Sequence, residues 1–145
     1  MDRSSEQTIK AMGGGDLRIV IYSHDTYGLG HLTRTHRTAT GIVEALPEAS
    51  VLIVSGSPIA HRFHFPDRVD YLKLPSVVKL GPSEYGSCKL SITPRRISRL
   101  RSRRILSAID FFRPDLLMVD HLPFGLKGEP PPALRHPRRQ YPPSP

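Results

Sequence analysis

Continuous apolar runs alternate along the chain with segments whose apolar residues recur at helical spacing. Leu17 to Tyr22 is mainly apolar and β-branched without polar alternation, which predicts a strand covered on both faces. A polar, glycine-bearing turn follows from Ser23 to Gly30. From His31 onward the apolar residues fall on one face of a predicted helix: Leu32, Ala39, Ile42, Val43 and Leu46. Strand, turn and helix in this order form the first half of a βαβ unit.

The same alternation continues to residue 119. Val51–Val54 predicts a second strand after Pro47 ends the first helix. Pro58–Phe65 is interpreted as a short helix, and Val69–Leu74 as a third, more polar strand near a sheet edge. Leu116–Val119 is interpreted as a fourth, buried strand.

A second long helix is predicted over Pro94–Arg113, with Thr93 as N-cap and Pro94 at the first helical position. Its expected buried stripe is Ile97, Leu100, Ile105, Ala108, Ile109 and Phe112. The preceding segment, 76–94, has no clean period. We interpret it as a long loop that either contacts a substrate or is a disordered insertion.

This order of elements predicts an α/β fold, a Rossmann-like parallel sheet with flanking helices and right-handed crossovers. We expect a flexible lead-in over residues 1–16, one folded domain over 17–129 and a disordered proline-rich tail over 130–145. No stretch approaches the roughly 20 apolar residues that span a bilayer, and the N-terminus lacks the apolar core of a secretory signal. With the single cysteine Cys88, these features predict a cytoplasmic protein.

The formal net charge is +8, and it is concentrated in one region. Residues 86–109 contain seven Lys or Arg residues and no acid. The arginines at 95, 96, 99, 103 and 104 lie largely outside the predicted buried stripe. A solvated helix face is the default interpretation, and peripheral contact between the Arg95–Arg104 helix and an anionic membrane at its inner face is the alternative. We expect no nucleic-acid partner, because no aromatic residues are interleaved to stack on bases.

The turn before the first helix has features of an anion site. Gly28 and Gly30 allow a close approach of the backbone and a positive φ, and the helix start supplies unpaired N–H groups and a partial positive charge. His31 lies at the helix start as a candidate base or donor, and Arg34 lies one turn further on. The alternative is that the glycines only form a tight turn and that His31 caps the helix.

This turn is not the dinucleotide fingerprint. The third glycine of G-x-G-x-x-G falls at Thr33, and the only candidates for the acidic ribose ligand, Glu44 and Glu48, lie in or just after the helix. We therefore expect no cofactor, and no metal site is predicted.

Asp120 and His121 follow the fourth predicted strand directly. In a parallel sheet they reach the same edge as the Gly28–His31 turn, where α/β sheets bind ligands. Asp120 is a candidate to orient a histidine or to accept a hydrogen bond from a substrate hydroxyl, with capping of the next turn as the alternative.

The segments YSHDTYGLGHLTR and PDLLMVDHLPFG, with a basic helix between them, resemble the N-terminal domain of predicted glycosyltransferases with the two-domain GT-B fold. These proteins are distant relatives of the MurG-like enzymes. The resemblance covers about residues 17–129 and implies an acceptor-binding half, with the nucleotide-sugar donor bound by a second domain.

By position, the resemblance places Gly28, Gly30 and His31 in the glycine-rich loop that approaches an acceptor pyrophosphate and the transferred sugar. It makes His31 the candidate base or electrostatic helper and places Asp120 and His121 at the border of the cleft. The implied partners are a nucleotide-sugar donor, only with a second domain, and a sugar or lipid-linked acceptor.

The chain departs from the family after Glu129, where Pro130–Pro132 replaces an expected helix. We therefore expect a truncated or frame-shifted end and no activity of this half alone. Two alternatives stay open: a nucleotide-sugar hydrolase, because some relatives with a similar G-x-G-H-x-x-R turn use water as acceptor and Arg34 fits that pattern, and a non-catalytic basic fragment that binds anions.

Overall fold

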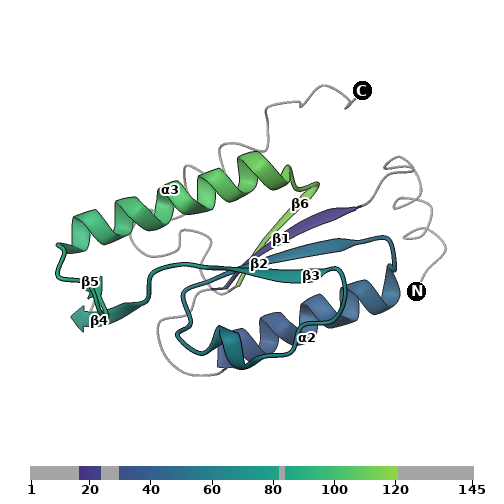
Figure 1. Ribbon diagram of the computed structural model, residues 1–145, viewed down its shortest axis with the longest axis horizontal. Coiled ribbons are helices and arrows are strands. Elements are labelled where there is room, and N and C mark those ends of the chain that lie inside the picture. The colour runs from purple at the N-terminus through teal and green to yellow at the C-terminus, as the bar shows by residue number, and fades with distance from the viewer. Residues whose placement is uncertain (1–16, 24–29, 82–83, 121–145) are drawn as a thin grey trace.

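The fold is built on one four-stranded parallel sheet in the order β3–β2–β1–β6 (Figure 1). The computed structural model describes residues 17–23, 30–81 and 84–120. The strands are β1 (Arg18–Ser23), β2 (Ser50–Ser55), β3 (Val69–Lys73) and β6 (Leu116–Val119). Strand β1 pairs with β2 on one side and with β6 on the other. The predicted α/β parallel sheet is confirmed, and the architecture is consistent with a Rossmann-like fold.

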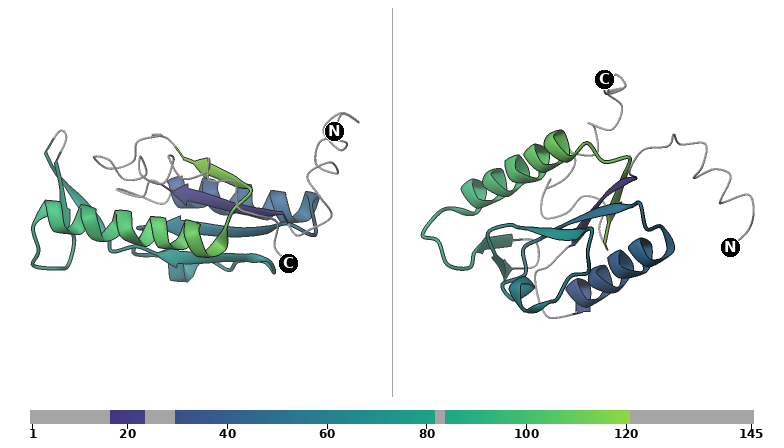
Figure 2. Two further views of the ribbon diagram at one scale, coloured as in Figure 1. Left: turned by 90° about the horizontal axis from the view of Figure 1, so that it is seen from above. Right: turned by 45° about the vertical axis from the view of Figure 1, so that its right-hand side comes forward.

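Two helices cover the sheet, one on each face (Figures 1 and 2). They are α2 (Gly30–Ala45) and α3 (Pro94–Phe112). Helix α2 connects β1 to β2, and α3 precedes β6, so both return the chain to a parallel strand. Both helices therefore begin near the edge at which the parallel strands end, which we call the carboxyl edge.

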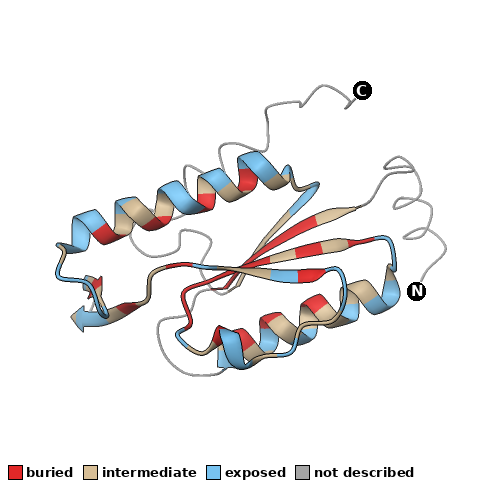
Figure 3. Ribbon diagram, viewed as in Figure 1, coloured by how far each residue is buried: buried red, intermediate tan, exposed pale blue. Residues whose placement is uncertain are grey.

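Residues of β1 alternate between the two layers because successive side chains of a strand point to opposite faces. Val20 and Tyr22 belong to the core cluster that contains α3 residues, and Ile19 and Ile21 belong to the cluster that contains Ala39 of α2. All four are buried, as expected for a strand covered on both faces. In Figure 3 the buried residues run along the sheet and along the sides of α2 and α3 that face it.

The boundaries of α3 follow local sequence signals. The Thr93 hydroxyl accepts a hydrogen bond from the Arg96 backbone N–H at 3.4 Å, and Pro94 is the first helical residue, as predicted. At the other end, Arg113 takes a left-handed conformation with φ 50°, and its N–H donates to the Ile109 carbonyl. This is an αL-type helix end built without glycine.

Three expectations about individual elements were wrong. The segment 76–94 is not a structureless loop, because it contains an antiparallel hairpin of β4 (Val77–Gly81) and β5 (Glu84–Ser87). Only Ala60–Arg62 of the expected short helix is helical, as a 3-10 turn labelled η1. Strand β6 is half-exposed rather than buried, because it forms an edge of the described sheet.

A buried arginine was not foreseen in the stripe of α3. Arg101 is 1% exposed and donates from Nη1 to the Pro75 carbonyl, where the chain passes from β3 to β4. Its guanidinium packs on the backbone of Gly56, where a built Cβ would come within 2.6 Å of Nη1. Arg101 thus joins α3 to the carboxyl ends of β2 and β3, and Gly56 leaves room for it.

The predicted lead-in over residues 1–16, the proline-rich tail over 130–145 and the segment 121–129 lie outside the described residues. Within the part of the chain that the structure describes, neither α2 nor α3 is apolar enough over a sufficient length to cross a membrane.

Candidate functional site

The register of the sheet aligns the last residues of its strands at the carboxyl edge. Ser23 pairs with Ser55, and Ser55 pairs with Lys73. Asp120 continues β6 by one residue, since its backbone N–H donates to the Tyr22 carbonyl at 2.9 Å. A row of polar residues therefore lies at the carboxyl ends of these strands.

Strand alternation decides which way Asp120 faces. Met118 packs in the core cluster on the α2 side, and Val119 packs in the cluster on the α3 side. The next residue, Asp120, therefore returns to the α2 side. Helix α2 begins there, with His31 and Arg34 one turn apart on the same side of the helix.

The structure brings His31, Arg34 and Asp120 into direct contact. His31 Nδ1 lies 2.7 Å from Asp120 Oδ2, and Arg34 Nη1 donates to Asp120 Oδ1 at 3.0 Å. The side chain of Asp120 is 11% exposed, that of His31 is 25% exposed and that of Arg34 is 64% exposed. The carboxylate is thus largely withdrawn from water, with a donor on each of its oxygens, while the imidazole and the guanidinium retain access to solvent.

This arrangement sets the protonation pattern of His31. An ionised carboxylate only accepts hydrogen bonds, so Nδ1 must be the donor in the contact with Asp120. In the neutral ring, Nε2 is then the acceptor nitrogen. A histidine held in this way can take a proton at Nε2, while the carboxylate stabilises the resulting imidazolium.

The alternative in which His31 only caps its own helix is not what the structure shows. His31 is the second residue of α2, and its Nδ1 is engaged by a residue 89 positions away in the sequence. The alternative in which Asp120 caps the next turn involves residues from 121 onward, which lie outside the described part of the chain.

The positive φ expected at the glycines of this turn is not found at Gly30. Gly30 is the first residue of α2. Among the described residues, a built Cβ at Gly30 would meet nothing within 4 Å, so the packing of these residues does not require glycine there. The two other predicted site residues, Gly28 and His121, lie outside the described residues.

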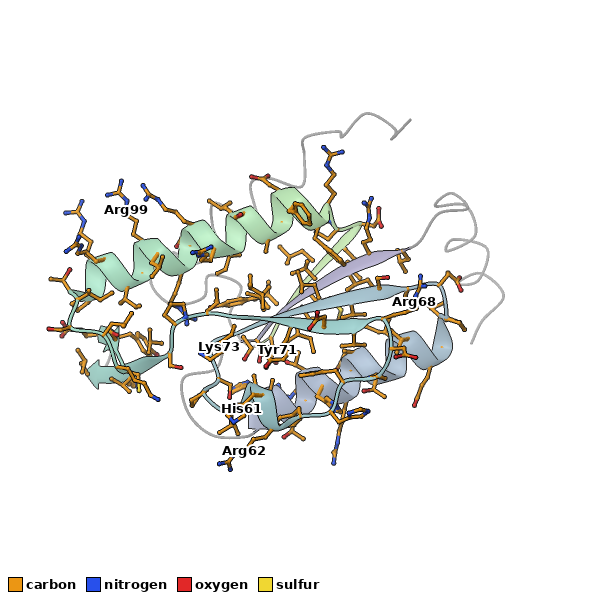
Figure 4. The ribbon with its side chains drawn as sticks, viewed as in Figure 1. His61, Arg62, Arg68, Tyr71, Lys73 and Arg99 are labelled. Carbon is orange, nitrogen blue, oxygen red and sulfur yellow. The ribbon has the colours of Figure 1, made fainter. Side chains whose placement is uncertain are left out.

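Sequence reasoning did not single out Lys73. Its ammonium group donates to the Gly56 carbonyl at 3.2 Å, to the Ser76 hydroxyl at 2.9 Å and to the Leu74 carbonyl. These contacts tie the end of β3 to the turn after β2 (Figure 4). The available signal was a lysine at the carboxyl end of a predicted strand. Its contacts make it part of the scaffold beside the site.

A second histidine of α2 has a different environment. His36 packs against Phe63 and Phe65 with ring centroids 5.4 and 5.3 Å away, and its Nε2 lies 2.8 Å from the His64 carbonyl oxygen. Aromatic neighbours and a backbone partner indicate a structural role. The contrast between His31 and His36 supports the assignment of proton chemistry to His31 and not to His36.

No group of three or more His, Cys, Asp or Glu side chains is arranged to hold a metal ion within residues 17–23, 30–81 and 84–120. Comparisons with protein families, with curated proteins and with solved structures found no match to this chain. We therefore infer a function from the chemistry of the residues at the carboxyl edge.

Proposed function

We propose that this chain supplies the acceptor-binding half of a GT-B glycosyltransferase that transfers a sugar from a nucleotide-sugar donor. One observation carries the proposal: Asp120 at the end of β6 holds His31 and Arg34 at the start of α2. A helix start favours a phosphate or carboxylate, and an oriented imidazole beside it provides a base. The resemblance of the YSHDTYGLGHLTR segment supports the same interpretation.

In the proposed reaction an acceptor hydroxyl attacks the anomeric carbon of the donor sugar. The hydroxyl proton passes to His31 Nε2 as the new C–O bond forms, and the bond from the anomeric carbon to the nucleotide phosphate breaks. The phosphate leaves with the bonding electron pair, and the configuration at the anomeric carbon is inverted. Asp120 orients His31 and stabilises the imidazolium, as a general base of this kind requires.

In this proposal the start of α2 and Arg34 face the phosphate group of the acceptor. Arg34 is bound to Asp120 through Nη1 and is 64% exposed, so its outer donors are available to an anion. Stabilisation of the leaving phosphates is assigned to a donor-binding domain that the described residues do not include.

A titration of the 145-residue chain with glucose 1-phosphate tests the binding half of the proposal. We expect the backbone amide signals of residues 30–34 to shift with a common, saturable concentration dependence. Arg34→Gln should weaken binding about tenfold, because it removes a charge-assisted hydrogen bond. Arg37→Gln, an exposed arginine of the same helix, should leave the affinity unchanged.

Absence of any shift at residues 30–34, or an equal loss in Arg34→Gln and Arg37→Gln, would reject the site. The hydrolase alternative uses the same residues with water in place of the acceptor hydroxyl. The two functions differ in their products, which are a glycoside for transfer and the free sugar for hydrolysis. Product analysis of a protein that carries this α2 sequence together with a donor-binding domain separates them.

A further inference from the structure

The acids of the described residues gather at one end of the sheet. We call the edge at which the parallel strands begin the amino edge. Of the eight Asp and Glu residues in segments 17–23, 30–81 and 84–120, six are exposed at this edge, in the last turns of α2 and α3 or at the starts of β2, β3 and β6. They are Glu44, Glu48, Asp67, Asp70, Asp110 and Asp115. The three arginines of the same edge, Arg18, Arg68 and Arg113, do not balance these six acids.

The carboxyl edge has the opposite charge. Helix α2 begins there after β1, and the β4–β5 hairpin and the start of α3 follow the end of β3. The hairpin packs on the first turns of α3 through Val77, Tyr85 and Ile97, beyond the ends of the strands (Figure 1). Glu84 is the one exposed acid on these elements among the described residues. We call their six exposed basic residues the carboxyl-edge cations: Arg34, Lys79, Lys89, Arg95, Arg96 and Arg99.

Folding does not explain this separation of charge. Apart from Arg34, none of the carboxyl-edge cations forms an ion pair with a described residue. Arg95 and Arg96 lie in the first turn of α3, where the helix dipole disfavours positive charge and no acid is present. A surface charge that does not stabilise its own helix is available to a ligand. The opposite charges of the two edges create a field that draws an anion towards the carboxyl edge.

The extent of the carboxyl-edge cations indicates the size of that anion. A single phosphate at the start of α2 meets Arg34 but leaves the five cations of the hairpin and α3 without a partner. These five are distributed over separate elements, so a ligand that uses them carries several negative charges along its length. Planar guanidinium groups and helix starts both match phosphate oxygens, which favours phosphate as the repeated group.

We propose that the acceptor is a chain that carries several phosphate groups and runs from Arg34 across the β4–β5 hairpin to the first turns of α3. The identification of this ligand as the acceptor rests on the proposed function, whereas its binding is measured without any sugar transfer. The chain end that reaches the start of α2 presents its hydroxyl to His31, and the remaining phosphates bind the cations of the hairpin and α3. Affinity therefore increases with the number of phosphates.

Calorimetric titration of the full chain with short linear inorganic polyphosphate and with glucose 1-phosphate tests the proposal. We expect polyphosphate to bind about a hundredfold more tightly at low salt, because it contacts about five cations rather than one. Its affinity should fall about a hundredfold between about 50 and 200 mM salt, whereas that of glucose 1-phosphate should fall only a few-fold. Polyphosphate should also displace glucose 1-phosphate from residues 30–34.

Two pairs of arginines on α3 provide a matched comparison. Replacement of Arg95 and Arg96 by Gln should lower the affinity for polyphosphate about tenfold, since it removes two contacts. Replacement of Arg103 and Arg104 by Gln removes the same net charge eight residues further along α3, about 12 Å from the first pair. We expect this second pair to cost less than about threefold. Equal losses in the two variants would overturn the proposal, because net charge alone would then explain the binding.

The other outcomes separate this proposal from the sugar-transfer proposal. If glucose 1-phosphate shifts residues 30–34 and polyphosphate binds no more tightly, the phosphate chain is rejected and the sugar-transfer site is retained. If polyphosphate binds as expected and glucose 1-phosphate leaves residues 30–34 unchanged, the sugar-transfer site alone is rejected. Tighter binding of single-stranded DNA or polygalacturonate than of polyphosphate with the same number of charges would overturn the assignment of a phosphate chain.

Discussion

Arg101→Ala is expected to lower the free energy of unfolding by about 3 kcal/mol, because it combines a cavity with an unsatisfied carbonyl. Arg101 is the largest of the fully buried side chains in the described residues. Its truncation removes the donor to the Pro75 carbonyl and empties the space above Gly56. Urea denaturation followed by far-UV circular dichroism measures the loss.

Arg99→Ala is the matched control for this prediction, since it removes the same side chain type two residues away on the exposed side of α3. Its effect should stay within about 0.5 kcal/mol, as is usual for surface positions. Arg101→Met, which keeps most of the volume, should recover part of the loss. Equal stability of the Arg101→Ala and Arg99→Ala variants would show that Arg101 does not hold α3 to the sheet.

Asp120→Ala is expected to destabilise the protein by about 2 kcal/mol, because both oxygens of a mostly buried carboxylate bond to α2. Double-mutant cycles with His31→Ala and Arg34→Ala divide the effect between the two partners. We expect a coupling of about 1.5 kcal/mol with His31, which is half-buried and close to Asp120. The coupling with Arg34 should be below about 0.5 kcal/mol, since Arg34 is mostly exposed and its pair is screened by solvent.

Thermodynamic measurements on the four variants of each cycle provide this comparison. A coupling to Arg34 that equals or exceeds the coupling to His31 would contradict the assignment of Asp120 as the residue that positions His31. Arg37→Ala serves as the control, because Arg37 is exposed on α2 and has no contact with Asp120 among the described interactions.

The sheet and its helices could be predicted because their signals are local. The apolar run of β1 and the helical spacing of α2 each follow from a few neighbouring residues. Thr93 and Pro94 fixed the start of α3 in the same way. The approach of His31 to Asp120 could also be predicted, because parallel strands end at one edge and both residues follow such an end.

The features that were missed lack a clear signal in the neighbouring sequence. The β4–β5 hairpin lacks a clean alternating pattern, and it pairs in an irregular register between Lys79 and Gly81. Arg101 interrupts an apolar stripe and reads as a surface residue until its partners are known, since Pro75 and Gly56 lie 26 and 45 positions before it. The expectation that β6 is buried was wrong because β6 lies at an edge of the described sheet. Four apolar residues in a row do not reveal that one side of the strand has no neighbour among the described strands.

The function inferred for the carboxyl edge depends on the claim that Asp120 holds His31 with the proton on Nδ1. Long-range ¹H–¹⁵N NMR of the imidazole ring measures this tautomer directly. We predict that neutral His31 is an Nδ1–H tautomer in the unmodified chain and that Asp120→Ala shifts it towards Nε2–H, the form usually preferred by a free imidazole. A predominant Nε2–H tautomer in the unmodified chain, or a tautomer that does not respond to Asp120→Ala, would contradict the assignment of Asp120 as the residue that orients His31.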